Sequence, residues 1–342
     1  MVSLSLMLYG GLVISVLLLF KKMSNVKSPF FKIGYFLYSR TRIGQYYFQR
    51  ELSKAKQKFE HGHSVTQDTQ FDGLKIHPIP MSEDNYAYLV IDQKNDVSVL
   101  VDPADPEVVQ EHIDKEKATP SAILTTHKHW DHSGGNSEFK RRYRDILIYG
   151  GAMDSIPAVT NPVADGDNIE VGSLRFRVKF TPGHTVGHVV YILDGSPFNC
   201  PNSLFSGDHL FISGCGRMFE GPPTTMLRSL DSLLELSDCT LVWPGHEYAR
   251  DNLEFSSHLE PDNEEIKEKL ARVLQLRQSR ACTAPSNMGE EKKLNPFLRT
   301  SEEKMLQILG FEQKPTVEEN FAVRAKALAE IRERKDKFKY KL

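Results

Sequence analysis

The sequence predicts an α/β protein in which helices pack on β-sheets. Short apolar runs rich in β-branched residues recur from residue 74 onward, and Gly, Pro, Asn and Asp separate them, as strand boundaries require. Residues 224–236 lie among these runs and have helical periodicity, with Met226, Leu230 and Leu233 on one face. The chain of 342 residues is 40% hydrophobic and 26% charged, which is typical of a globular protein with a substantial core.

Several of the predicted strands end beside a residue that can bind a metal. We expect strands at residues 86–92, 97–102, 121–126, 146–150, 174–180, 188–193, 204–208 and 240–245. Four of these strands lead into His127, His184, Asp208 and His246, respectively. Functional sites are usually built from loops at one rim of a rigid sheet, so these side chains are expected to converge.

The N-terminus has a different composition from the rest of the chain. Residues 2–20 form a 19-residue run without a charge, and Lys21 and Lys22 follow it. Such a run can cross most of a hydrocarbon core of roughly 30 Å, and it lacks the charge pattern and cleavage site of a secretory signal. We interpret residues 1–22 as a membrane anchor, with a buried core helix as the alternative. Because positive flanks stay cytoplasmic, the remainder of the chain is expected to face the cytosol.

Residues 23–73 are expected to form a basic amphipathic segment and a linker. Residues 21–58 contain ten Lys and Arg side chains against one acid, Glu51. The mixture of rings and cations at residues 30–59 fits a helix at an anionic membrane surface. It fits a mitochondrial presequence equally well, so a mitochondrial association stays open. The net charge of the whole chain is only −2, so no global field selects nucleic acid as a partner.

The stretch THKHWDHSGG, residues 126–135, carries the strongest chemical signal. It places His127, His129, Asp131 and His132 within six positions. Imidazoles and carboxylates are ligands for zinc or iron, and one ion cannot take all four with good geometry. The first two side chains can turn to one side and the last two to another, which implies two metals. The further ligands would be His184 and His246 at other strand ends, with Asp208 as a bridge between the metals.

These motifs resemble the metallo-β-lactamase superfamily and, within it, hydroxyacylglutathione hydrolase (glyoxalase II). The matching blocks are DNYAYLVID, THKHWDHSGGN, TPGHTVGH, LFSGDHLFISGCGRMFEG, PGHEYARDNLEF, NPFLR and RERKDKF, and they run in family order. The resemblance implies a four-layer αββα sandwich with a C-terminal helical domain. We therefore expect a catalytic domain at residues 74–246 and a substrate-binding helical domain at residues 247–342.

The resemblance also implies a ligand set and a reaction. One metal would be held by His127, His129 and His184, a second by Asp131, His132 and His246, and Asp208 would bridge them. Zinc is the expected metal, with iron and manganese as alternatives. The implied reaction is hydrolysis of a glutathione thioester of the S-lactoylglutathione type by a hydroxide that bridges the metals. Asp131 and Asp208 are the expected catalytic residues, since Asp131 would also help to orient this nucleophile.

The expected substrate contacts are Arg217, Phe219, Tyr248, Arg332 and Lys335. By resemblance, Tyr248 and the pair of C-terminal cations match side chains that hold glutathione. Arg217 and Phe219 depart from the family, which typically has lysine and tyrosine at these positions. Loss of one hydrogen bond to a charged group costs roughly 1.5–3 kcal/mol, which is enough to weaken glutathione binding about ten-fold or more.

Two other functions remain open at this point. The chain could be a persulfide-dioxygenase-like enzyme with a single iron, or a weakly active scaffold that retains its metal site for folding. The full set of seven ligands and the helical C-terminal part argue against the first alternative. The sequence names no protein partner, and metal stoichiometry together with turnover would separate the three functions.

Overall fold

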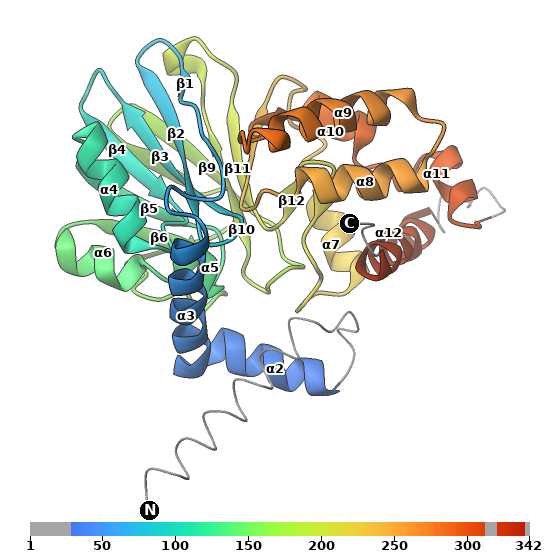
Figure 1. Ribbon diagram of the computed structural model, residues 1–342, viewed down its shortest axis with the longest axis horizontal. Helices are drawn as coiled ribbons and strands as arrows, with labels where there is room; N and C mark the ends of the chain where they lie inside the picture. The colour runs from blue at the N-terminus through green and yellow to red at the C-terminus, as the bar shows by residue number, and fades with distance from the viewer. Residues whose placement is uncertain (1–28, 312–319, 339–342) are drawn as a thin grey trace, which may run out of the picture.

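The computed structural model describes residues 29–311 and 320–338 (Figure 1). The predicted anchor at residues 2–20 lies outside the described residues. Within them, no helix has the length and apolar character needed to cross a membrane. Two β-sheets form the centre of the molecule, with helices on both sides.

The first sheet contains seven strands in sequence order, from β1 to β7. The strands are β1 (Thr69–Gln70), β2 (Leu74–Met81), β3 (Asn85–Asp92), β4 (Val97–Val101), β5 (Pro120–Thr125), β6 (Leu147–Gly151) and β7 (Asn161–Val163). Strands β1 to β4 are antiparallel, whereas β4 to β7 are parallel. The parallel strands align their carboxyl ends at one edge of the sheet, and β5 leads there into the histidine-rich loop.

The second sheet contains six strands in the order β15-β14-β11-β10-β9-β8. They are β8 (Asn168–Val171), β9 (Leu174–Phe180), β10 (Val189–Leu193), β11 (Ser203–Gly207), β14 (Leu241–Pro244) and β15 (Ser286–Asn287). Parallel pairing of β11 with β14 places the residues that follow both strands at one edge. The eight strands expected from the sequence are all present in the two sheets, displaced by at most one residue at either end.

Three apolar layers hold the sheets and helices together. The central layer lies between the sheets and includes Tyr88, Phe205 and Trp243. A second layer lies between the outer face of the first sheet and the helices α3 (Arg42–Lys58), α4 (Pro106–Glu116) and α6 (Asn136–Arg142). A third layer packs the second sheet against α7 (Pro223–Asp231) and the C-terminal helices. This arrangement is an αββα sandwich, as the family resemblance implied.

The C-terminal part is helical and covers the second sheet (Figure 1). It contains α8 (Ala249–Leu259), α9 (Glu264–Gln278), α10 (Met288–Leu294), α11 (Glu303–Ile308) and α12 (Asn320–Lys337). Helix α12 buries Ala327, Leu328 and Ile331 in the third apolar layer. Its last turns carry Arg332 and Lys335 toward the centre of the molecule, where both line a cavity.

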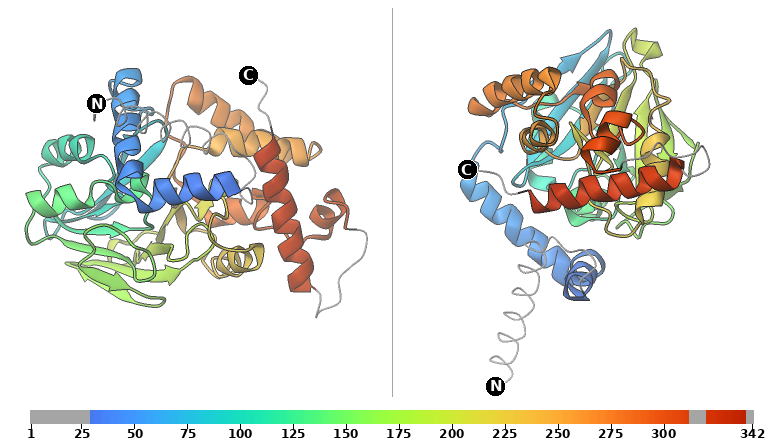
Figure 2. Two further views of the ribbon diagram at one scale, coloured as in Figure 1. Left: turned by 90° about the horizontal axis from the view of Figure 1, so that it is seen from below. Right: turned by 90° about the vertical axis from the view of Figure 1, so that its right-hand side faces the viewer.

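The described part of the basic segment packs against the sandwich. Helix α3 places Phe48 and Leu52 in the apolar layer outside the first sheet. Helix α2 (Pro29–Arg40), which precedes α3 in the chain, crosses the side of the molecule near α12 (Figure 2). Its buried side chains include Phe31 and Tyr35, and Phe30, Ile33 and Phe36 stay exposed. Residues 29–58 therefore pack against the part of the chain that the sequence predicts as the catalytic domain.

Candidate metal centre and substrate cavity

The candidate metal centre lies at the edge of the sandwich where the carboxyl ends of several strands meet. His127 follows β5, Asp208 follows β11 and His246 comes two residues after β14. His184 lies in the turn between β9 and β10. The structure thus brings together all seven side chains that the sequence marks as candidate ligands, and all but the partly exposed Asp131 are buried.

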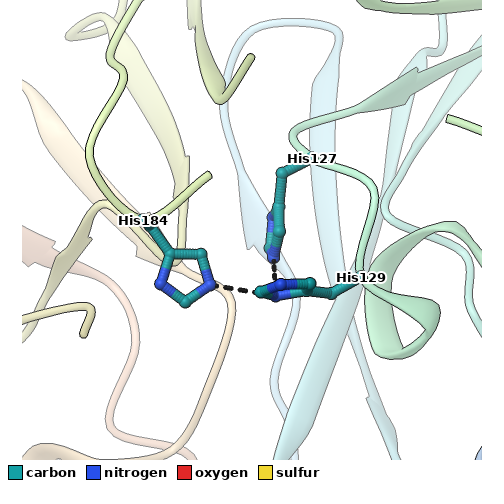
Figure 3. A group of neighbouring side chains, drawn as sticks. All are labelled: His127, His129 and His184. Atoms are coloured by element: carbon teal, nitrogen blue, oxygen red, sulfur yellow. Dashed lines mark hydrogen bonds between the residues drawn. The ribbon is translucent and has the colours of Figure 1, made fainter. Parts of the chain in front are cut away.

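His127, His129 and His184 form the first group of potential ligands (Figure 3). The Nδ1 atom of His129 lies 3.0 Å from Nε2 of His127 and 3.0 Å from Nε2 of His184. Three ring nitrogens therefore point at one small volume. Neutral imidazoles converging in this way are the usual ligands of a zinc or iron ion.

Asp131, His132 and His246 form the second group of potential ligands. Oδ2 of Asp131 lies 3.6 Å from Nε2 of His246 and 3.9 Å from Nε2 of His132. Asp208 stands between the groups: its Oδ1 lies 3.2 Å from Nε2 of both His132 and His246, and its Oδ2 lies 3.4 Å from Nε2 of His184. Each oxygen of Asp208 thus faces a different group, which is the geometry of a bridging carboxylate.

The ring nitrogen of each histidine that points away from the centre has a partner. His132 Nδ1 lies 2.9 Å from Asp102 and His246 Nδ1 lies 2.8 Å from Asp84. His184 Nδ1 donates to the carbonyl of Arg217 at 2.8 Å. Such partners fix the tautomer and the ring orientation of a ligating histidine.

Asp84 and Asp102 were not predicted as site residues, although each stands at one end of a predicted strand. Asp84 opens the block DNYAYLVID, and Asp102 ends the strand run VSVLVD. His188, four residues after His184, is buried against the ring of His127 and contacts the Thr181 hydroxyl at 3.0 Å. It belongs to none of the ligand groups in the described part of the chain.

The two groups differ in their electrostatics. Burial lowers the pKa of His127 and His129 well below the ordinary value, so these imidazoles are neutral. Burial also opposes the protonation of His246, but the carboxylates of Asp208 and Asp84 raise its pKa to about 10. Burial would raise the pKa of Asp208, but His246 and His132 hold it well below the ordinary value. The neutral histidines of the first group can bind a metal ion without losing a proton. A metal ion at the second group must displace protons from its histidines.

The side chains fit divalent cations. His132 Nε2 and Asp208 Oδ1 are buried, and neither has a hydrogen-bond partner among the described residues. Gly245 makes room beside them, because a Cβ atom there would lie 2.7 Å from Asp208 Oδ1 and 2.7 Å from His132 Cε1. A bound cation can take both atoms as ligands in place of the protons that the carboxylates attract to this group.

A further acidic cluster lies elsewhere on the first sheet, formed by Asp68, His77 and Glu116. It already contains a cation, because Lys75 Nζ lies 2.7 Å from Asp68 and 2.6 Å from Glu116. The ammonium group neutralises these carboxylates, so this cluster does not compete with the main centre as a metal site.

One cavity of about 410 Å³ opens beside the metal-ligand groups. Its walls include the five side chains that the sequence predicts as substrate contacts, Arg217, Phe219, Tyr248, Arg332 and Lys335. The ring of Tyr248 stacks on His246 with centroids 4.7 Å apart. Asp336 forms ion pairs with the two arginines of this cavity, since its Oδ1 lies 3.3 Å from Nε of Arg217 and 2.7 Å from a guanidinium nitrogen of Arg332.

Comparison with known proteins matches the two halves of this architecture separately. Residues 83–246 match the metallo-β-lactamase superfamily, and residues 247–338 match the hydroxyacylglutathione hydrolase C-terminus. The chain is 38% identical over 270 residues to the cytoplasmic hydroxyacylglutathione hydrolase of Arabidopsis thaliana, covering 78% of this chain and 100% of that protein. This chain belongs to the hydroxyacylglutathione hydrolase family. Membership confirms the predicted class of enzyme, a metal-dependent thioester hydrolase.

Other relatives agree with this family. A hydroxyacylglutathione hydrolase of Vibrio cholerae serotype O1 is 42% identical over 229 residues, which cover 67% of this chain and 88% of that protein. Among solved structures, a metallo-β-lactamase from Staphylococcus aureus matches with a TM-score of 0.50 and 25% identity, over 71% of this chain and 68% of that one. Helices α2 and α3 lie outside both family matches.

Proposed function

We propose that this member of the hydroxyacylglutathione hydrolase family hydrolyses glutathione thioesters with two divalent metal ions, and that its N-terminus attaches it to a membrane. The observation that carries the catalytic part is the shared cavity. Its walls include potential metal ligands together with three cations, Arg217, Arg332 and Lys335. Glutathione is a peptide with two carboxylates, so a cationic wall beside a metal centre suits its thioesters.

The residues of the site would bind the metals, bind the substrate and position the nucleophile. Two divalent cations held by the His and Asp side chains supply Lewis-acid polarisation of a carbonyl and a hydroxide nucleophile at neutral pH. Arg332 and Lys335 bind substrate carboxylate, and Asp336 keeps the guanidinium of Arg332 in place. Asp131, whose Oδ2 faces His132 and His246, helps to hold the nucleophile in line with the carbonyl carbon.

The decisive experiment measures metal content and turnover on one sample of the full chain in mild detergent. Metal per chain is determined by elemental analysis, and hydrolysis is followed with S-D-lactoylglutathione. A matched substrate is the lactoyl thioester of N-acetylcysteamine, which lacks the glutathione carboxylates. We expect two metals per chain, loss of turnover on chelation and a much lower kcat/KM for the truncated thioester. One iron per chain would instead favour the persulfide-dioxygenase-like alternative.

A variant pair tests the cationic wall. Arg332→Ala should raise KM for the glutathione thioester and leave the truncated thioester unaffected, because only the former has a carboxylate to bind. Lys326→Ala is the matched control, since this lysine is exposed on the same helix and does not line the cavity. An equal loss of kcat/KM for both substrates in Arg332→Ala would contradict a role of Arg332 in binding the glutathione carboxylates. Two metals with negligible turnover would leave the scaffold alternative in place.

Membrane attachment is supported by the sequence and by the outer face of α2. The uncharged run at residues 2–20 is long enough for an anchor. The exposed side of α2 presents Phe30, Ile33 and Phe36, which are 75%, 54% and 59% exposed. Exposed cations, including Lys32 and Arg40, accompany these side chains, as in helices that lie on anionic lipid.

Vesicle flotation tests the attachment. The full chain should float with phosphatidylcholine vesicles and resist extraction by high salt. A chain without residues 1–22 should float only with vesicles that contain phosphatidylserine, and salt should release it. A full chain that remains soluble without detergent or lipid would refute the anchor. Protease accessibility of the catalytic domain in intact organelles would then test whether it faces the cytosol.

A further inference from the structure

Helix α2 contributes to the metal centre although it lies outside both family matches. Its buried face carries Phe31 and Tyr35, which stack with Phe219 at centroid distances of 5.7 Å and 5.1 Å. Phe219 in turn packs 5.0 Å from the ring of His184. Tyr35 and Tyr38 also line the cavity beside the potential ligands. This helix is therefore one wall of the site.

The hydroxyl of Tyr35 connects a buried ion pair to a potential ligand. It donates to Oε1 of Glu220 at 3.0 Å and lies 3.0 Å from Nε2 of His129. Glu220 also binds the buried ammonium of Lys128 at 2.7 Å and accepts the backbone N–H of Val186 at 2.8 Å. Burial would raise the pKa of Glu220, but these donors hold it below the ordinary value, so the carboxylate is ionised and only accepts.

The direction of these hydrogen bonds indicates which ring nitrogen of His129 carries the proton. Since the Tyr35 proton is committed to Glu220, the Tyr35 oxygen must accept a hydrogen bond from His129, which places the imidazole proton on Nε2. The other nitrogen, Nδ1, is then unprotonated. It is this nitrogen that faces His127 and His184 at 3.0 Å each. The tautomer that Tyr35 selects is thus the one that a metal ligand at His129 requires.

Tyr38 makes the corresponding contact in the second group. Its hydroxyl donates to Oδ1 of Asp131 at 3.0 Å, and Oδ2 remains directed toward His132 and His246. The carbonyl of Tyr38 accepts the indole N–H of Trp130 at 2.8 Å, which ties α2 to the histidine-rich loop. One helical turn therefore reaches one potential ligand in each group.

We propose that Tyr35 and Tyr38 are positioning residues of the metal centre, supplied by a helix added to the family's catalytic domain. Tyr35 sets the tautomer of His129 at the first metal, and Tyr38 sets the orientation of the Asp131 carboxylate at the second. The proposal rests on the ligand roles in the proposed function. It assigns α2 to the catalytic machinery, whereas the sequence left this segment open between a helix at a membrane surface and a mitochondrial presequence.

The test uses Tyr35→Phe and Tyr38→Phe in the full chain, because phenylalanine retains the ring packing and removes only the hydroxyl. Tyr46→Phe is the matched control, since Tyr46 lies in the neighbouring helix and is 62% exposed. Co²⁺ is titrated against a competing chelator, and the visible absorption of bound Co²⁺ reports on the ligand geometry. Thermal unfolding of the chelated proteins checks that each variant folds as the parent does.

Loss of an outer partner of a ligand typically weakens metal affinity about 10–100-fold. We expect a loss of this size at one site in Tyr35→Phe and at the other in Tyr38→Phe, each with an altered Co²⁺ spectrum and none in Tyr46→Phe. Parental affinity and spectrum in both tyrosine variants would overturn the proposal. Metal binding without thioester turnover would defeat only the proposed function, whereas a parent chain that binds no metal overturns both.

Discussion

The buried ammonium of Lys128 offers a direct test of the site's architecture. Lys128 lies between His127 and His129, and its side chain is 1% exposed. Its Nζ atom lies 2.7 Å from Glu220 and 3.2 Å from Asp154, whose side chain is fully buried. Replacing Lys128 by methionine keeps the aliphatic length and leaves the buried carboxylate of Asp154 and the partly buried carboxylate of Glu220 without their cation.

The structure allows the size of the effect to be worked out. Removing one partner of a buried ion pair costs roughly 3–5 kcal/mol. The carboxylate of Asp154 would retain bonds from the Lys128 backbone N–H, the Thr185 hydroxyl and the Gly187 N–H. Glu220 would retain Tyr35 and the N–H of Val186. Because of this partial compensation, we expect Lys128→Met to lower the free energy of unfolding by about 3 kcal/mol, which for a chain of 342 residues is a fall in Tm of roughly 4 °C.

The assay is thermal and urea unfolding of the chelated protein, followed by circular dichroism. Lys115→Met is the control, because this lysine is exposed and its loss should change stability by less than about 0.5 kcal/mol. Adding Glu220→Gln to Lys128→Met should restore part of the stability, since one uncompensated charge disappears. A Tm within 2 °C of the parent for Lys128→Met would refute the reasoning. So would a double variant less stable than the single one.

Four further changes test the centre and the cavity. Asp208→Ala should lower metal content and hydrolysis together, because this carboxylate faces both ligand groups; normal hydrolysis would contradict the two-metal mechanism. Gly245→Ala should lower metal content measured by elemental analysis, since its Cβ would lie 2.7 Å from Asp208 Oδ1. Burial lowers the pKa of Lys335 to about 7, so its positive charge is present below pH 7 and is lost above it. The KM for an anionic thioester should therefore rise between pH 6 and pH 8.5, and a KM that does not change with pH would exclude Lys335 from substrate binding. Arg217→Lys with Phe219→Tyr should raise kcat/KM for S-D-lactoylglutathione, and no gain would mean that acyl specificity lies elsewhere.

The strands and the candidate ligands could be predicted because their signals are local. The run ending at Thr125 reads as a buried strand from its own residues, and four candidate ligands stand in one loop. Strand β2 gave no such signal, since Pro78 and Pro80 interrupt it. The structure shows how both are tolerated: they pair with Tyr88 and Tyr86 of β3, and β1 on the other side pairs only as far as Ile76.

The outer partners of the ligands could not be predicted because they come from distant parts of the chain. Asp84 meets His246 across 162 positions, and Tyr35 meets His129 across 94. A carboxylate at a strand end or a tyrosine in a basic helix has many ordinary roles on its own. Only the fold brings each one to a particular ring nitrogen.

Helix α2 changes how the expected departures at Arg217 and Phe219 should be understood. A tyrosine at 219 would have a polar group, but here the Phe219 ring lies against Tyr35 of α2, whose own hydroxyl reaches Glu220 and His129. The apolar ring therefore matches a site in which α2 supplies the hydroxyl. On this argument, Phe219 and α2 form one structural unit, and restoring tyrosine at 219 should be judged together with Tyr35→Phe. Coupling between the two changes, measured as non-additive effects on kcat/KM, would establish that the helix and the altered motif act together.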